Sequence, residues 1–213
     1  MSQSIMAHIL ITSGPTRQYL DPVRYLTNAS SGRMGSALAA AALELGHQVT
    51  IVSGPVQVSY PEAAHVVSVV STEEMLEVCR GLFDDCDGLI GAAAPCDYRP
   101  VAIEPSKISK TGQPLMLELI ETDDVVATLG QQKQGRWVVG FALETDDQRL
   151  RALAKLERKH CDLIVVNGPE AMHSADNQVD VLDPSGNVIA TLAGPKPKVA
   201  CGILTLIQER LIK

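Results

Sequence analysis

The sequence contains no apolar stretch that approaches the ~20 residues needed to cross a bilayer as a helix, so a membrane span is not expected. Its first residues, MSQSIMAHILIT, lack the basic-then-apolar pattern of a signal peptide. The five cysteines include no C-x-x-C pair, and no two histidines have metal-ligand spacing, which argues against a disulfide framework or a zinc site. We therefore expect a cytoplasmic protein with no metal site built from its own side chains.

The chain also lacks an excess of positive charge, since its formal net charge is −7. This balance argues against nucleic-acid binding, and we expect no nucleic-acid partner. Basic side chains nevertheless gather in two segments, at Arg17, Arg24 and Arg33 and at Arg99, Lys107 and Lys110. Because salt screens charges beyond ~8–10 Å, such local clusters can still bind a small anionic ligand.

Three features of a dinucleotide-dependent oxidoreductase are missing as well. The glycines do not form G-x-G-x-x-G, and the second predicted strand ends in Ser53-Gly54-Pro55, where a ribose-binding acid is expected. No tyrosine is followed four residues later by the lysine that a short-chain dehydrogenase needs. A nucleotide, if one binds, is held differently.

Apolar runs and helical periodicities alternate along the 213 residues, which we interpret as a single domain, residues 1–213. Strands are predicted at His8–Ser13, Gln48–Ser53, Val66–Val70, Gly88–Ala93, Leu115–Ile120, Trp137–Ala142 and Leu163–Asn167. Helices are predicted at Arg33–Leu45, Thr72–Phe83, Asp124–Gln132, Gln148–His160 and Pro195–Leu211, the second with a capping box at Ser71 and Glu74. The run VDVLDPSGNVIATL predicts a β-hairpin that turns at Asp183–Gly186. The pattern indicates a Rossmann-like, three-layer, doubly wound α/β fold with a mostly parallel sheet and a C-terminal β-hairpin.

The segment from Ile9 to Gly35 carries the strongest functional signal. A predicted strand ends at Gly14, and a loop rich in Arg, Asn and Ser follows it. A helix then begins near Arg33, after Gly32. Backbone N–H groups at a helix start lack intrahelical partners, so this geometry suits an anionic ligand. Asn28 is a candidate amide donor to an oxyanion or phosphoryl oxygen, or else it caps the helix or a turn. Ser30 and Ser31 are more simply caps than nucleophiles.

Two further groups are candidates for binding a nucleotide. Asp97 directly follows a buried strand, where its carboxylate could accept from a base or ribose, hold hydrated Mg²⁺, close an Asx-turn or pair with Arg99. Lys107 lies in the long segment Ala94–Pro114, where it is either solvated or follows charge developing on a phosphate. Lys155 and Lys159 share one helix face by their i,i+4 spacing, with Glu157 or a polyphosphate as counter-anion.

Together these motifs resemble one family. The order GPTR-x-x-x-DPVRY-x-x-N-x-SSG-x-MG, DYRP, K-x-x-K and VVGFALET is similar to that of the phosphopantothenate–cysteine ligases, over residues 8 to beyond 167. In bacteria this domain is often fused behind a flavin-dependent decarboxylase. The chain has no room for one, so it looks like a stand-alone ligase and no flavin is expected.

The resemblance implies a step of coenzyme A biosynthesis. The carboxylate of 4′-phosphopantothenate attacks the α-phosphate of CTP, pyrophosphate leaves, and an acyl-cytidylate forms. The amine of L-cysteine then displaces CMP and gives 4′-phosphopantothenoylcysteine. Mg²⁺ is expected with the nucleoside triphosphate, and ATP is the alternative to CTP. Family members are dimers in which the long loop acts across the interface, so we expect a homodimer and a loop that is mobile without ligand.

The resemblance also assigns residues. The catalytic positions are Asn28, which would stabilise the acyl-cytidylate, and Lys107, which would act on the phosphates and the intermediate. The nucleotide-binding positions are Gly91, Ala92, Ala93, Asp97, Lys107, Asp123, Asp124, Val125, Val126, Phe141, Lys155 and Lys159. Three positions would seat a substrate phosphate: Ser31, Gly32 and Met34.

The chain departs from the family pattern at three places. Ala94-Pro95-Cys96 replaces small-Val-Ala, Ser109 interrupts a lysine-rich motif, and Asp123 replaces a proline. These changes leave CTP or ATP, and the contacts of the loop, open. Two rival functions are an NAD(P)-dependent oxidoreductase, which an NADPH titration tests, and a nucleotide sensor, which would bind CTP without releasing pyrophosphate.

Overall fold

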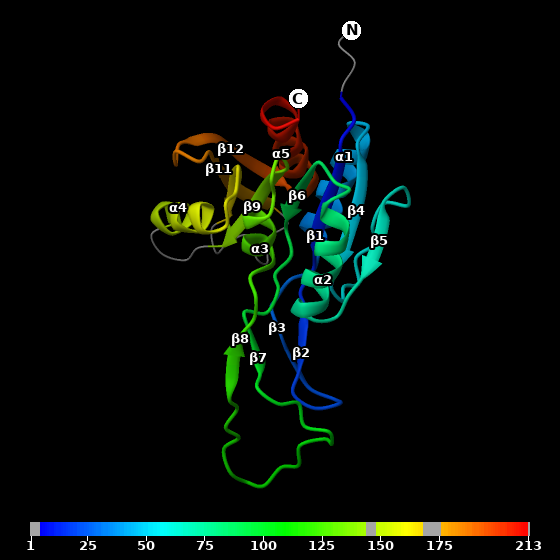
Figure 1. The fold of residues 1–213 in the computed structure, drawn as a ribbon, viewed down its shortest axis with the longest axis vertical. Coiled ribbons are helices and arrows are strands. Elements are labelled where there is room, and N and C mark those ends of the chain that lie inside the picture. Colours follow the sequence, from blue (N-terminus) through cyan, green and yellow to red (C-terminus); the bar gives the residue numbers. More distant parts are fainter. Residues whose placement is uncertain (1–4, 144–147, 168–175, 213) are drawn as a thin grey trace.

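The computed structural model describes residues 5–143, 148–167 and 176–212. Its main sheet has eight strands in the order β12-β11-β10-β9-β6-β1-β4-β5 (Figure 1). The strands are β1 (His8–Ser13), β4 (Gln48–Ser53), β5 (His65–Ser68), β6 (Gly88–Gly91), β9 (Trp137–Leu143), β10 (Leu163–Asn167), β11 (Asp176–Leu182) and β12 (Val188–Pro195). The predicted strands of this sheet therefore form, with ends that shift by a few residues.

Six neighbouring strands of this sheet run parallel, β10, β9, β6, β1, β4 and β5, whereas β11 and β12 are added antiparallel at one edge. Along the parallel part the strands follow the doubly wound order, in which the chain moves outward from β1 in one direction and then returns to continue in the other. The hairpin β11–β12 turns where predicted, with Gly186 N–H donating to the Asp183 carbonyl at 2.9 Å. The predicted fold class is confirmed.

Helices cover both faces of the sheet (Figure 1). One face packs against α1 (Arg33–Glu44) and α5 (Lys196–Arg210), and the other against α2 (Thr72–Phe83), α3 (Val125–Gln131) and α4 (Gln148–Arg158). Strand β1 shows why, because its apolar residues serve both layers: Ile9 and Ile11 pack under α1, and Leu10 packs under α2. A parallel strand buried on both faces needs this continuous apolar run.

The predicted capping box at the start of α2 is present, with one difference. Ser71 Oγ accepts from Glu74 N–H at 3.1 Å. The Glu74 carboxylate accepts from Val70 N–H at 2.8 Å, one residue before the cap itself. The reciprocal bonds satisfy two donors at the helix start, which is the stabilising principle of the motif.

Two short ribbons lie outside the main sheet. One pairs β2 (Arg17–Tyr19) with β3 (Tyr25–Thr27), and the other pairs β7 (Tyr98–Pro100) with β8 (Leu119–Glu121). We call the β7–β8 ribbon and the segment between its strands, residues 98–121, the arm; Figure 1 shows it projecting from the carboxyl ends of the sheet beside β2–β3. The prediction of a strand at Leu115–Ile120 within the alternating layers is wrong. Only its end is a strand, and Leu115 and Met116 are 58% and 88% exposed, because an apolar run does not reveal what covers it.

The chain reverses its winding between β1 and β6, and a crevice opens there at the carboxyl ends of the strands. Gly14 and Asp97 come after β1 and β6 at this end, and Asn167 is the last residue of β10. Glu144, which the strand pattern also predicts at this end, lies outside the described residues. Within the described ranges, no helix combines the length and apolar character needed to cross a membrane.

Candidate active site

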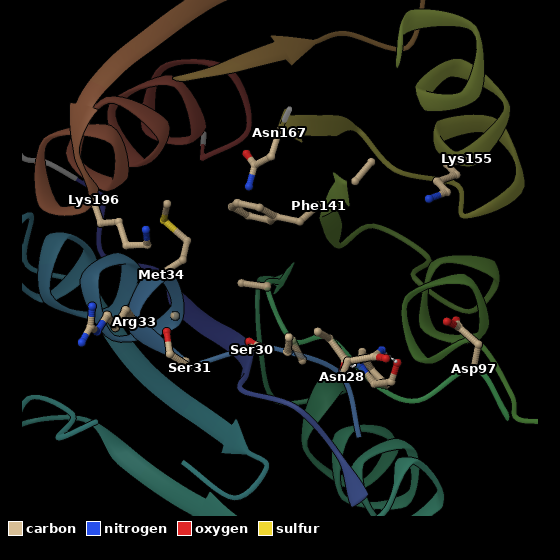
Figure 2. Close-up of a pocket in the computed structure, with 18 residues that line it drawn as sticks. Asn28, Ser30, Ser31, Arg33, Met34, Asp97, Phe141, Lys155, Asn167 and Lys196 are labelled. Carbon is tan, nitrogen blue, oxygen red and sulfur yellow. Dashed lines mark hydrogen bonds between the residues drawn. The ribbon is translucent and has the colours of Figure 1, made fainter. Parts of the chain in front are cut away.

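Two adjoining cavities occupy the crevice. The larger, about 480 Å³, is lined by residues 28–35, Ala92–Pro95, Asp97, Phe141, Ala142, Lys155, Asn167 and Lys196 (Figure 2). The smaller, about 90 Å³, is lined by Thr12, Gly91, Ala93, Pro95–Asp97, Thr122–Val126, Phe141 and Lys159. Ala93, Pro95, Asp97 and Phe141 line both. Every residue assigned from the resemblance lies on one of these walls except Lys107.

Helix α1 begins at the larger cavity without a side-chain cap. Its N-cap residue is Gly32, in the left-handed conformation at φ 74°, and no side chain accepts from the first turn. The expectation that Ser30 or Ser31 caps the helix is therefore wrong. Instead the Gly32 carbonyl accepts from Ser13 Oγ at 3.3 Å, and Tyr60 donates to Ser13 Oγ at 2.9 Å. These contacts with Ser13 and Tyr60 fix the start of the helix and leave its first N–H groups for a ligand.

The Asn28 side chain bridges the first loop to the segment that follows β6. Its Nδ2 donates to the Pro95 carbonyl at 2.8 Å and to the Ala94 carbonyl at 3.4 Å. The alternative that Asn28 caps a helix is wrong. Because carbonyls only accept, the amide nitrogen must face them, and the amide oxygen is turned away. The bonds hold Asn28 at the wall where the two cavities meet, and a donor role toward substrate stays a prediction.

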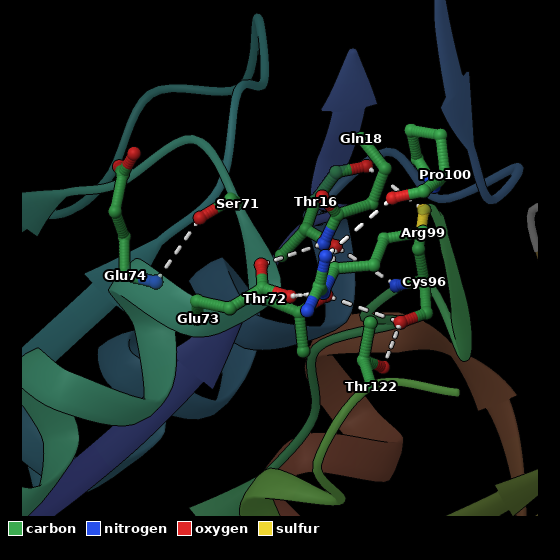
Figure 3. Close-up of polar contacts among 10 residues, drawn as sticks. All are labelled: Thr16, Gln18, Ser71, Thr72, Glu73, Glu74, Cys96, Arg99, Pro100 and Thr122. Atoms are coloured by element: carbon green, nitrogen blue, oxygen red, sulfur yellow. Dashed lines mark hydrogen bonds and ion pairs between the residues drawn. The ribbon is translucent and has the colours of Figure 1, made fainter. Parts of the chain in front are cut away.

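A buried polar cluster supports this wall (Figure 3). The Cys96 N–H donates to Thr16 Oγ1 at 2.8 Å, and the Cys96 carbonyl accepts from Thr72 Oγ1 at 3.1 Å and from Thr122 Oγ1 at 2.6 Å. Since Thr72 donates to Cys96, the 2.9 Å contact between the Thr16 and Thr72 hydroxyls is donated by Thr16. The cluster joins four segments and holds the backbone on both sides of Cys96, which positions Pro95 and Asp97.

The Cys96 thiol is not a nucleophile in this setting. Its side chain is buried, and burial raises its pKa even though the neighbouring Thr16 and the backbone at Asn28 act in the opposite direction. A raised thiol pKa keeps the group protonated at neutral pH, and the thiolate is the reactive form.

The Asp97 carboxylate makes no hydrogen bond or ion pair with another described residue and is exposed at the junction of the cavities (Figure 2). The alternative that it pairs with Arg99 is wrong, because Arg99 Nε lies 3.1 Å from the Glu73 carboxylate. An unengaged carboxylate at the junction suits a ribose hydroxyl, a base amine or the water shell of a cation.

Asp124 and Lys159 form the polar wall of the smaller cavity. Asp124 caps α3 by accepting from Ala127 N–H at 3.1 Å, and its other oxygen lies 3.0 Å from Lys159 Nζ. Although burial raises the pKa of Asp124, Lys159, the Ala127 N–H and Arg158 lower it below the usual value. The carboxylate that pairs with Lys159 is thus that of Asp124 and not that of Glu157. The i,i+4 spacing describes one helix only, so it could not predict a partner at the start of α3.

Gly91 allows α3 to approach the end of β6. A Cβ atom at this position would come within 2.4 Å of Val126 Cγ2, closer than atoms can approach without a shift. The close approach brings Asp123–Val126 and Gly91 onto one cavity wall. Residues assigned from distant segments are therefore brought together by packing.

The far end of the larger cavity contains residues that the sequence analysis did not assign. Lys196, the first residue of α5, lines it together with Arg33, and Asn167 has a buried Oδ1 without a recorded partner (Figure 2). Burial, and then the nearby Arg33, lower the pKa of Lys196. Of the basic residues Arg17, Arg24 and Arg33, only Arg33 lines this cavity. Lys196 reaches it because the hairpin β11–β12 returns the chain beside α1.

Lys107 is not brought to either cavity. It is exposed on the arm and lines a separate hollow of about 420 Å³ with Leu20, Pro100–Ala102, Glu104, Ser106, Ile108 and Leu115–Glu118. Figure 1 shows the arm extending away from the sheet end. A role for Lys107 at the cavity of its own subunit would require the arm to move.

No group of three or more His, Cys, Asp or Glu side chains that could hold a metal ion occurs among the described residues. The five cysteines are free, four of them buried and Cys201 exposed. The charged groups that line the cavities are Arg33, three lysines and the carboxylates of Asp97, Asp123 and Asp124, and the basic groups suit a phosphorylated ligand.

Comparison with known proteins agrees with this arrangement. A family model described as "DNA/pantothenate metabolism flavoprotein C-terminal domain" matches residues 5–211. The chain is 40% identical over 207 residues to the "Coenzyme A biosynthesis bifunctional protein CoaBC" of Vibrio vulnificus, covering 94% of the chain and 51% of that protein. The chain thus spans about half the length of such curated relatives.

Solved structures give the same result. The crystal structure of the C-terminal domain of a CoaBC protein is 36% identical, with a TM-score of 0.83, and covers 99% of this chain and 98% of that one. A Cab2 variant in complex with phosphopantothenate-cysteine shares the fold, with a TM-score of 0.81, 16% identity and coverage of 96% and 86%. The motifs, the fold and these matches lead to one conclusion: the chain belongs to the family of the DNA/pantothenate metabolism flavoprotein C-terminal domain, and the family resemblance inferred from the sequence is confirmed.

Proposed function

We propose that this domain is a phosphopantothenate–cysteine ligase, which joins 4′-phosphopantothenate to L-cysteine at the expense of CTP in coenzyme A biosynthesis. The observation that carries the proposal is the pair of adjoining cavities. Residues assigned to the nucleotide and residues assigned to the substrate phosphate come from separate segments, yet they line two cavities with a common wall at Ala93, Pro95, Asp97 and Phe141. A carboxylate bound in one can therefore meet an α-phosphate bound in the other.

The reaction would proceed in two steps. A carboxylate oxygen of 4′-phosphopantothenate forms a bond to the α-phosphorus as the bond to the β-phosphate oxygen breaks, which releases pyrophosphate and leaves an acyl-cytidylate. The cysteine nitrogen then bonds to the acyl carbon, loses a proton and expels CMP. Attachment to the nucleotide supplies a leaving group that a free carboxylate lacks.

The substrate phosphate would bind at the far end of the larger cavity. There Ser31, Gly32 and Met34 surround the uncapped start of α1, and Lys196 and Arg33 supply positive charge. An anion is stabilised by the free N–H groups and by the helix dipole. The phosphate would also relieve the repulsion between Lys196 and Arg33 that contributes to the lowered pKa of Lys196.

The nucleotide would occupy the smaller cavity and the shared wall. Lys159 and Lys155 would bind its phosphates, Asp97 would accept from the ribose or base, and Phe141 would pack against it. Gly91–Ala93 and Asp123–Val126 would contact it through their backbone. Because Asp124 already accepts from Lys159 and Ala127, a triphosphate would compete with the Asp124 carboxylate for Lys159.

Mg²⁺ fits this site as an ion carried by the nucleotide. It keeps several waters and needs only one or two carboxylates, and Asp97 offers one that no described residue engages. When bound it would neutralise charge on the triphosphate and on leaving pyrophosphate. Neither proposed step oxidises or reduces a substrate, so we propose no flavin for this domain, although the family name contains the word flavoprotein.

We propose that the domain acts as a homodimer. Lys107 lies on an arm away from its own cavities, and the arm exposes Tyr98, Val101, Ile103 and Met116 by 48%, 47%, 62% and 88%. Exposed apolar clusters of this kind mark association surfaces. A second copy of the chain would cover them and receive Lys107. The coenzyme A pathway and the reduced cysteines fit a cytoplasmic location.

The test is an assay with 4′-phosphopantothenate, L-cysteine, Mg²⁺ and each of the four nucleoside triphosphates in turn. We expect pyrophosphate release and 4′-phosphopantothenoylcysteine with CTP, and less with ATP. Release that does not depend on 4′-phosphopantothenate, or the absence of product with every triphosphate, would contradict the proposal. Binding of CTP without release would identify a sensor.

A further inference from the structure

Asp21 is a buried carboxylate that neither cavity uses. It lies between β2 and β3, in the sequence DPVRY, and its exposed fraction is 0%. Aspartate is almost never fully buried unless it is paired, so its partners should explain its presence. Those partners come from two segments that lie far apart in the sequence.

The first set of partners is local. Asp21 Oδ1 accepts from Val23 N–H and from Arg24 N–H, both at 2.7 Å. Arg24 also donates to Asp21 Oδ2 through its guanidinium, at 2.6 Å. These three bonds fix the turn between β2 and β3 and orient Arg24.

The second set belongs to the arm. Asp21 Oδ2 accepts from Ile108 N–H at 3.1 Å, and the Arg24 guanidinium donates to the Ile108 carbonyl at 3.0 Å. The Asp21–Arg24 pair therefore binds both the N–H and the carbonyl of Ile108, which lies 87 positions from Asp21 in the sequence. In addition, Glu104 N–H donates to the Leu20 carbonyl at 2.9 Å. Residues 104–108, which include Lys107, are fixed against the turn at both ends.

Other attachments of the arm are sparse. Among the described residues, every recorded hydrogen bond between residues 102–117 and the rest of the chain goes to Leu20, Asp21 or Arg24. Lys107 itself is exposed, so its backbone is held while its ammonium group is left to act elsewhere. A cation that must reach a ligand from an extended segment loses less conformational freedom if its backbone is already fixed.

The Asp21 carboxylate is held in its ionised form. Burial by itself raises its pKa, but the N–H groups of Val23, Ile108 and Arg24 and the Arg24 guanidinium lower the pKa to about 2. The group is therefore ionised throughout the pH range in which a protein of this kind operates. Its contacts can be altered by substitution but not by ordinary changes of pH.

We propose that Asp21 is a positioning residue for the ligase reaction, which holds the segment carrying Lys107 against the β2–β3 turn and so sets where that lysine meets the nucleotide phosphates. The inference rests on the proposed function, because it assigns Asp21 a consequence in catalysis. A merely structural Asp21 would affect stability and leave turnover of the folded protein unchanged.

The test uses Asp21→Asn and a matched control, Asp183→Asn. Asp183 also closes a turn by accepting from backbone N–H groups, those of Ser185 and Asn187 at 3.0 and 2.9 Å, but it lies in the β11–β12 hairpin. An asparagine at position 21 has one amide oxygen, so its NH₂ group must face one of the two pairs of donors. We expect faster amide hydrogen exchange in residues 104–110 of the first variant only.

Turnover supplies the second readout, through a double-mutant cycle with Lys107→Gln. We expect Asp21→Asn to lower kcat by about ten- to a hundredfold, as for misplacement of a catalytic group, with a smaller change in the KM for CTP. In the Lys107→Gln background the same substitution should lower kcat by less than about twofold, because its effect passes through Lys107.

Two results would overturn the inference: equal loss of kcat in both backgrounds, or unchanged exchange in residues 104–110. If Asp21→Asn does not fold, Ile108→Pro replaces it, since proline removes the N–H that Asp21 accepts and leaves Asp21 in place. Faster exchange in residues 104–107 supports the inference, and unchanged exchange contradicts it. A wild-type protein without ligase activity contradicts the proposed function instead, while the exchange measurement still decides whether Asp21 holds the segment.

Discussion

The wall between the two cavities and the arm are built in opposite ways. At the wall, Cys96 is buried and hydrogen-bonded to three threonines from three segments, and Asn28 adds a fourth link. In the arm, residues 102–117 are mostly exposed and held to the rest of the described chain only near Leu20–Arg24. The cavity wall is therefore held by contacts from several segments, whereas the position of the segment that carries Lys107 depends on one anchor and, we propose, on a second subunit.

The substitution with the largest expected effect is Asn28→Ala, at the wall between the cavities. We expect ligation to fall by about 100- to 1,000-fold, because a positioned amide at a developing oxyanion contributes about that much. CTP binding by calorimetry should stay within about threefold, since the nucleotide contacts other residues. The folding free energy should fall by only about 1 kcal/mol, the net value of an exposed hydrogen bond.

Asn187→Ala is the control for that variant, because Asn187 is also an exposed asparagine that hydrogen-bonds a turn, to Asp183 at 3.4 Å. It should retain wild-type activity. Near-wild-type product formation by Asn28→Ala would show that the amide is not needed for the reaction.

Lys107→Gln tests the arm. We expect kcat to fall by about 100-fold, the usual cost of removing a group that stabilises transition-state charge. The melting temperature should change by less than about 2 °C, because an exposed side chain contributes little to the core. Lys110→Gln, which removes an exposed cation from the same segment, should have a smaller effect on kcat. A large loss of stability in Lys107→Gln would identify a structural lysine instead.

Lys196→Ala tests the far end of the larger cavity. Loss of a charged hydrogen bond to phosphate, worth about 1.5–3 kcal/mol, should raise the KM for 4′-phosphopantothenate by about ten- to a hundredfold. The control is Lys198→Ala, two residues along the same helix start but outside the cavity wall. Equal effects of the two substitutions would show that net positive charge, and not a contact with Lys196, governs binding. An unchanged KM in Lys196→Ala would show that the phosphate does not bind at this end of the cavity.

Asp124→Ala gives the smallest expected change. The loss of the helix cap and of the contact with Lys159 should lower the free energy of unfolding by about 1 kcal/mol at pH 7, measured in urea. Because the pKa of Asp124 is lowered in the folded protein, this stabilisation is present above the ordinary pKa of an aspartate and is lost as the pH falls through the folded value. The two proteins should therefore converge in acid. A difference that persists unchanged there would assign the effect to something other than the carboxylate charge.

The sequence predicted the features that depend on local patterns and missed those that depend on contacts between distant segments. The strand and helix periodicities located the sheet, and every residue assigned from the motifs except Lys107 lies on a cavity wall, because each is a local pattern. Lys196 was missed, since its place beside α1 depends on how the β11–β12 hairpin returns the chain. The helix-capping roles expected for Asn28, Ser30 and Ser31 were wrong because Gly32 takes the cap position. The partner of Lys159 and the anchor at Ile108 also required contacts between distant segments.

The central claim is that the carboxylate of 4′-phosphopantothenate becomes bonded to the nucleotide before cysteine reacts. The most direct measurement uses 4′-phosphopantothenate labelled with ¹⁸O in its carboxylate, with mass spectrometry of the CMP formed. The account predicts that CMP carries one ¹⁸O atom from the substrate. Product formation with unlabelled CMP would contradict it.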